Sequence, residues 1–246
     1  MPDVLGHLTA VVDKGPYYPT QQILELACAA QRVNGSYIKT QEVIFSNEED
    51  GQFKPLYTKQ PNKILMLVTL DPKFWTADPK DQPYPLKVTQ EDKDVAESIK
   101  KHYRKLAFSA VAGTNEFETS VNAILNSETV PVNHFGYVAC LPSLHVRDVM
   151  QTNVKKAARD ADEGYLGEIG EWLMDLDCEI LLVQRSKNFD AWNIDATINN
   201  KLVSWMSKVA LKTGPCVVVK AKVKDLTTHW KHETPVTRLN YVRAAQ

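Results

Sequence analysis

The strongest candidate functional residues are three lysines, Lys220, Lys222 and Lys224, which alternate with Ala221 and Val223. Alternate residues of a β-strand point to one face and lie about 6.6 Å apart, so such a row can follow a phosphate backbone. The alternative interpretation is a solvated strand face, or a sheet edge that lysine protects from aggregation. The further cationic candidates around this row are Lys187, Lys201, Lys231 and Arg238.

The positive charge of the chain is concentrated towards its C-terminal end. From Trp205 to Gln246 there are eight Lys or Arg residues against two Asp or Glu residues, a local net charge of +6, whereas the whole chain carries −1. The other 204 residues therefore carry −7. This asymmetry favours a polyanionic partner such as nucleic acid.

Aromatic rings near these cations form the second candidate set. Trp192 and Trp205 share strand parity with apolar neighbours, so we expect them in the core, and Tyr241 lies in the last β segment. Trp230 and Phe189 lie in polar loops and are the rings predicted to stack on bases, at ~1–3 kcal/mol per base. The alternative for Trp230 is a ring folded over the end of the C-terminal domain.

Two further patterns could bind metal. Asp175, Asp177 and Glu179 alternate along one segment and could hold Mg²⁺ as in a nuclease, although an outward polar face explains them more simply. His229 and His232 have a spacing that zinc sites use, but no cysteine or acidic partner follows at metal-site spacing. The chain also contains no nucleotide-binding or hydrolase motif. We therefore expect a protein that is not an enzyme and has no metal or cofactor.

The elements that must position these residues are five short β segments in the last third of the chain. They are Met174–Val183, Trp192–Ile198, Leu202–Met206, Val217–Val223 and Val236–Val242. Asn199 and Asn200 predict a tight turn, because asparagine tolerates positive φ. Five strands in about 75 residues predict an OB-type barrel, with a Greek-key sandwich as the competing fold. Period-two alternation predicts two sets of inward residues: Met174, Leu176, Cys178 and Ile180, and Val217, Val219, Ala221 and Val223.

The preceding residues predict an α+β chain in three parts. Residues 1–84 form an N-terminal α/β region, 85–163 a helical middle region and 164–246 the barrel. Helices are expected from Thr20 to Arg32 and after Thr89–Asp92, and Lys63–Leu70 is expected to be a buried strand. Glycines at 164, 167 and 170 are expected to form a hinge into the barrel. Without a signal-peptide pattern or a long apolar run, the chain is expected to be soluble and cytoplasmic.

A resemblance to a known class of protein follows from several short strings. Tyr165–Gly170, Leu202–Trp205, Gly214, Val219–Lys224 and Thr237–Asn240 resemble an OB-type module of bacteriophage DNA-metabolism proteins. Upstream, the matching strings are Leu106–Phe108, Ala112–Gly113, Phe117–Glu118, Phe135–Gly136 and Ala139–Pro142. The resemblance spans roughly Lys63 to Val242. The loop from His229 to Glu233 departs from it, because it lacks the glycine that such modules usually place before the final strand.

The resemblance implies a non-enzymatic, single-stranded DNA-binding protein that acts in phage-type DNA replication, recombination or transcription, in the host cytoplasm if viral. The expected interface neutralises phosphates with Lys220, Lys222, Lys224, Lys231 and Arg238, with Lys187 and Lys201 nearby, and stacks bases on Trp230 and Phe189. Replication or transcription proteins are expected partners, and the chain could form homo-oligomers. The alternatives are a protein–protein adaptor whose basic face meets an acidic protein and, third, a metal-dependent nuclease.

Overall fold

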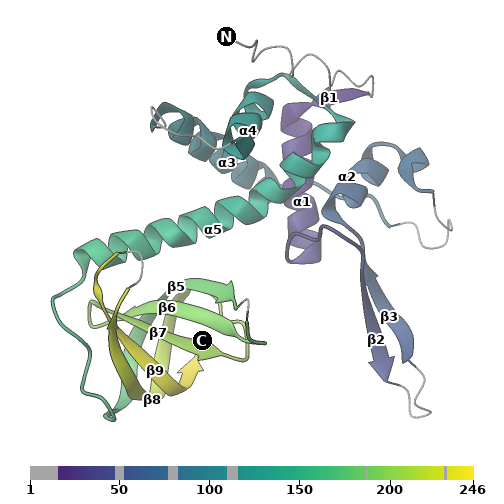
Figure 1. Ribbon diagram of the computed structural model, residues 1–246. Coiled ribbons are helices and arrows are strands. Elements are labelled where there is room, and N and C mark those ends of the chain that lie inside the picture. The colour runs from purple at the N-terminus through teal and green to yellow at the C-terminus, as the bar shows by residue number, and fades with distance from the viewer. Residues whose placement is uncertain (1–15, 48–52, 77–82, 110–115, 187, 230–231) are drawn as a thin grey trace, which may run out of the picture. The chain divides into compact units, whose positions relative to one another are not determined.

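The computed structural model describes residues 16–47, 53–76, 83–109, 116–186, 188–229 and 232–246 (Figure 1). The chain divides into two compact units, Met1–His145 and Val146–Gln246, and each is described by itself. The boundary falls within the long helix α5, Phe135–Asp160. The predicted boundaries at 84/85 and 163/164 stay predictions.

The first unit is built mainly from helices. Its elements are β1 (Tyr17–Pro19), α1 (Thr20–Asn34), β2 (Glu42–Asn47), β3 (Phe53–Lys59), α2 (Asn62–Leu70), η1 (Pro72–Phe74), α3 (Gln90–Ser109), α4 (Glu116–Asn126), β4 (Thr129–Pro131), η3 (Val132–His134) and the start of α5. Strands β1 and β4 pair with each other, as do β2 and β3. The core gathers around Ile23, Leu24, Met66, Ile99 and Phe135, all 0% exposed.

The expected strand at Lys63–Leu70 is wrong, because these residues belong to helix α2. The apolar run from Ile64 to Val68 shows neither a two-residue nor a four-residue period, and a short continuous run of this kind suits a buried strand and a buried helix equally. Contacts with other parts of the chain favour the helix over the strand. Asn62, fully buried at the start of α2, accepts hydrogen bonds at Oδ1 from Asn34 Nδ2 at 2.8 Å and from the Ile38 backbone N–H at 2.9 Å.

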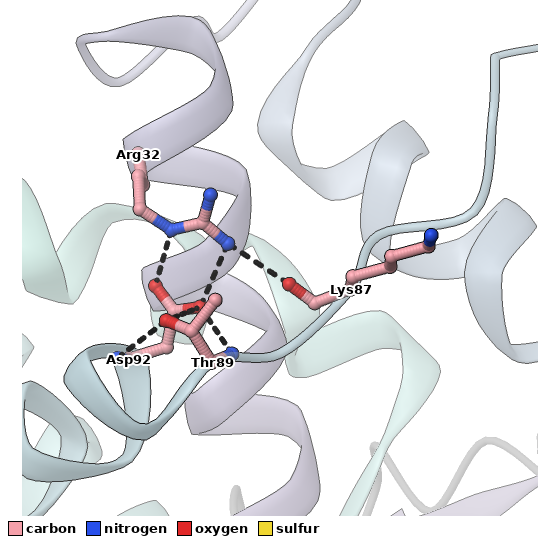
Figure 2. A network of polar contacts seen from close by, with 4 residues as sticks. All are labelled: Arg32, Lys87, Thr89 and Asp92. Carbon is pink, nitrogen blue, oxygen red and sulfur yellow. Dashed lines mark hydrogen bonds and ion pairs between the residues drawn. The ribbon is translucent and has the colours of Figure 1, made fainter.

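A network of polar contacts ties the start of α3 to α1 (Figure 2). The Arg32 guanidinium donates to both carboxylate oxygens of Asp92, at 3.0 and 2.9 Å, and to the carbonyl oxygen of Lys87 at 2.9 Å. The backbone N–H and the hydroxyl of Thr89 also donate to Asp92, so Thr89 and Asp92 cap the helix. The predicted helix start at Thr89–Asp92 is confirmed within one residue.

The second unit contains the predicted barrel, drawn from green to yellow in Figure 1. Its strands are β5 (Trp172–Arg185), β6 (Trp192–Ile198), β7 (Lys201–Ser207), β8 (Gly214–Thr228) and β9 (Pro235–Ala245). They close in the order β5-β6-β7-β9-β8, with β7 and β9 parallel. The α+β class and a closed five-stranded barrel consistent with an OB-type fold are confirmed, and closure excludes the sandwich. Asn199 and Asn200 have φ of 48° and 56°, as the predicted turn requires.

The predicted inward faces of β5 and β8 are partly wrong. Met174, Val217 and Val219 are 52%, 38% and 39% exposed, whereas Leu173 and Val218 are 8% and 0% exposed. On β5 the alternation changes parity at Asp175, whose φ is +48°. On β8 the alternation changes parity after Val218, where the register of the pairing with β9 shifts. Each irregularity is one residue that interrupts the alternation of inward and outward side chains. The inward side chains are therefore at odd positions on one side of it and at even positions on the other.

The segment before β5 is held against the barrel. Leu166 is buried in the barrel core, and its backbone N–H donates to the Thr237 hydroxyl at 2.8 Å. Gly164, Gly167 and Gly170 all have positive φ, so they provide left-handed turns that let the chain follow the barrel surface. In the described part of the chain, no helix is both long enough and apolar enough to cross a membrane.

Candidate nucleic-acid interface

The candidate site begins with Trp172, the first residue of β5. The backbone N–H of Gly170 donates to the carbonyl of Val223, and the Val223 N–H donates to the carbonyl of Glu171, both at 2.9 Å. These bonds bring the start of β5 against β8, where Trp172 pairs directly with Lys222. The indole is 46% exposed, so one end of the barrel sheet presents a large apolar ring to solvent.

Two lysines of β8 lie over this ring. Lys220 Nζ is 4.2 Å from the centroid of the Trp172 ring, and Lys222 Nζ is 5.6 Å from it. Both distances are within the range of cation–π attraction, which holds the ammonium groups beside the indole. The arrangement places positive charge next to an exposed aromatic ring, a combination that proteins use to bind single-stranded nucleic acid.

Tyr241 of β9 completes the aromatic pair. Its ring centroid lies 6.1 Å from that of Trp172, at an interplanar angle of 34°, and its side chain is 71% exposed. The register places Lys220 opposite Arg243 and Lys222 opposite Asn240, so β9 contains one more residue than β8 in this interval. Tyr241 lies in this bulge with φ of +52°, a conformation that costs an aromatic residue about 1–2 kcal/mol.

The local charge is positive and poorly compensated. Lys220 and Arg243 are directly opposite each other across β8 and β9, a like-charge pair that disfavours the sheet. Among the residues described, no ion pair joins Lys220, Lys222 or Arg243 to a carboxylate. We call the surface formed by Trp172, Lys220, Lys222, Tyr241 and Arg243 the aromatic–basic face. Strain at Tyr241 and repulsion between Lys220 and Arg243 both lower the stability of this part of the sheet.

The structure brings together only part of the predicted site. Lys220 and Lys222 meet at Trp172, and Lys224 is exposed two residues further along β8. Arg238 is exposed on β9 but lies 3.9 Å from the carboxylate of Asp225. Lys201 donates from Nζ to the backbone carbonyl of Glu163 at 2.7 Å, which holds it at the start of β7.

Of the predicted loop residues, the structure describes only Phe189, which lies away from this face. Phe189 is 64% exposed in the loop between β5 and β6, at the other end of β5 from Trp172. Lys187, Trp230 and Lys231 lie outside the described residues. Trp205 is 6% exposed, as predicted, and Trp192 is half-buried against the barrel core.

Trp172 is the functional candidate that the sequence did not single out. It precedes the predicted start of the first strand at Met174, so its pairing with Lys222 was not visible. The alternation predicted from Met174 onwards would place Trp172 inward, so its exposed position follows only from the change of parity at Asp175. Tyr241 was recognised as a barrel aromatic, but its outward position depends on the bulge in β9.

The acidic residues of β5 offer no metal centre in the described part of the chain. Asp175, Asp177 and Glu179 are exposed, and no group of three or more His, Cys, Asp or Glu side chains is placed to hold a metal ion among the residues described. A separate carboxyl has an unusual environment: burial raises the pKa of Asp195 on β6 to about 6. Its strand neighbours are Ser204 and Leu182, and it is not part of the aromatic–basic face.

Comparison of the chain with protein-family models, with curated proteins and with solved structures gives no match. The fold therefore defines the class at the level of an α+β protein with a closed five-stranded barrel.

Proposed function

We propose that this protein binds single-stranded nucleic acid, DNA in the first instance, without catalysing a reaction on it. The observation that carries the proposal is the aromatic–basic face: two exposed rings 6.1 Å apart, with two lysine ammonium groups over one of them. A role in phage-type DNA replication, recombination or transcription follows from the resemblance of the barrel strings and is part of the same proposal.

The mechanism combines stacking with charge neutralisation. Unpaired bases stack on Trp172 and Tyr241, because a base in a duplex already has both of its faces covered by its neighbours. The phosphates between them contact Lys220, Lys222 and Arg243, which lie on adjacent strands around the rings. This contact releases counterions and gives a salt-dependent affinity without a preference for sequence.

The test is a fluorescence-anisotropy titration of the full chain with labelled single-stranded and duplex oligonucleotides, at 50 and 200 mM salt. Each phosphate contact contributes about −0.7 to the slope of log affinity against log salt for a single strand. Three contacts therefore predict a loss of roughly 20-fold over this range. Tight, salt-sensitive binding to the single strand and weak binding to the duplex is the expected result. Absence of binding to either form at 50 mM salt would reject the proposal and favour an acidic protein as the partner of the basic face.

Two pairs of variants locate the interface. Trp172→Ala is expected to weaken single-strand binding by roughly 5- to 150-fold, which is the value of one stacked base. The matched control, Phe189→Ala, removes an exposed ring at the other end of β5 and is expected to leave the affinity unchanged. Lys222→Gln is expected to reduce the salt slope by about 0.7, whereas Lys212→Gln, in the exposed turn before β8, is expected to leave it intact. If Phe189→Ala weakened binding and Trp172→Ala did not, the binding site would instead include the predicted loop residues.

A further inference from the structure

A pair of reduced thiols lies on the inner side of the barrel wall, apart from the aromatic–basic face. Cys178 of β5 and Cys216 of β8 are direct partners across the antiparallel pair, and they are 5% and 6% exposed. The two thiols are close enough to influence each other's ionisation. The other two cysteines, Cys28 on α1 and Cys140 on α5, belong to the first unit.

The register by itself makes a covalent link between these thiols feasible. Residues directly opposite each other in an antiparallel pair have Cα atoms about 4.5–5.5 Å apart. A disulfide needs Cα atoms about 4.4–6.8 Å apart, so no strand has to move. Both side chains are buried at directly paired positions of β5 and β8, which places the two thiols side by side.

A small molecule can reach the pair from outside. A surface hollow is lined by both cysteines together with Thr197, Pro215 and Gln246, and Asp177 and Glu179 lie at the same hollow. The two carboxylates disfavour an anionic oxidant such as glutathione disulfide, whereas a neutral peroxide is not repelled.

We propose that Cys178 and Cys216 are a peroxide-sensitive pair that forms a disulfide between β5 and β8. Cys216, as its thiolate, attacks one oxygen of hydrogen peroxide, which forms the Cys216 sulfenic acid and releases hydroxide. The Cys178 thiol then loses its proton and attacks the Cys216 sulfur, forming the S–S bond and releasing water. Two thiols and one peroxide thus yield one disulfide and two waters, and the two electrons pass from sulfur to peroxide oxygen.

The order of the two thiols follows from their surroundings. Burial raises the pKa of both, and the nearby Glu179 carboxylate adds to the effect. For Cys216 the neighbouring Cys178 thiol acts in the opposite direction and lowers the pKa, so Cys216 is the easier of the two to ionise. The reaction is therefore slow at neutral pH and accelerates as the pH rises and the thiolate fraction grows.

The experiment treats the full chain carrying Cys28→Ala and Cys140→Ser with excess hydrogen peroxide, and maps disulfides by non-reducing digestion and mass spectrometry. We expect a cross-linked peptide containing Cys178 and Cys216, lighter by two hydrogen atoms, and a melting temperature for the barrel raised by about 10 °C or more that dithiothreitol reverses. In Cys178→Ser the sulfenic acid should accumulate on Cys216 and react with dimedone.

Two outcomes would overturn the proposal. One is that Cys178 and Cys216 stay reduced under conditions that fully oxidise Cys140 in the unmodified chain, in which Cys140 is the more exposed thiol. The other is oxidation of Cys216 to the sulfinic acid without any cross-link. The inference does not depend on nucleic-acid binding, because the thiols can be followed without any oligonucleotide.

Discussion

Replacing Tyr241 by asparagine separates the cost of its backbone conformation from the value of its ring. At φ of +52° a residue other than glycine pays about 1–2 kcal/mol, and asparagine is one of the few side chains that adopt this region readily. The change also removes the ring contact with Trp172, worth about 0.5–1.5 kcal/mol. Because the Tyr241 side chain is 71% exposed, little other burial is lost.

These two terms have opposite signs and similar size, so we expect the free energy of unfolding to change by less than about 1 kcal/mol. The affinity for single-stranded DNA should behave differently. Loss of one stacking ring costs ~1–3 kcal/mol, which is a weakening of roughly 5- to 150-fold. A substitution that is neutral for folding and costly for binding is the signature of strain kept for function.

The assay combines urea unfolding, followed by far-ultraviolet circular dichroism, with anisotropy titrations on the same preparations. Tyr241→Phe is the matched control, because it keeps the ring and the backbone strain, and both quantities should stay near those of the parent chain. Unchanged DNA affinity in Tyr241→Asn would refute the role of the ring. A loss of stability above about 2 kcal/mol would show that the ring supports the barrel instead.

Two carboxyl groups give predictions on stability. Burial raises the pKa of Asp92, but hydrogen bonds from Arg32 and Thr89 together with the Arg32 charge outweigh it and lower the pKa below 3.8. The stabilisation by the Asp92 carboxylate is therefore present at neutral pH and is lost as the pH falls below that value. Asp92→Asn should cost about 1–3 kcal/mol in urea unfolding at pH 7, a range discounted because Arg32 is 39% exposed. This cost should become smaller as the pH falls below 3.8, and the control Asp94→Asn should cost little. Burial raises the pKa of Asp195 from 3.8 to about 6, so the folded state is relatively less stable as the pH rises through this range. Asp195→Asn should therefore flatten the dependence of stability on pH between about 4 and 6 and raise stability at pH 7; an unaltered pH profile would contradict the assignment.

Several elements were predictable from the sequence because their causes lie within a few residues. Alternation along Trp192–Ile198 places apolar side chains on one face of a strand. Asn199 and Asn200 adopt the positive φ that their short polar side chains allow. Thr89 and Asp92 cap a helix across three residues. From such local signals the five strands, and with them the class of the barrel, could be anticipated.

The candidate interface depended on contacts that no local pattern contains. Trp172 meets Lys222 fifty residues later in the chain, and it meets Tyr241 only because β9 bulges against β8. Arg32 and Asp92 are likewise joined across 60 residues. A bulge reverses the side on which every later residue lies, and its position is set by the fit between paired strands rather than by either strand alone. The sequence by itself therefore determined the strands and their charge, and the tertiary structure decided which side chains share a surface.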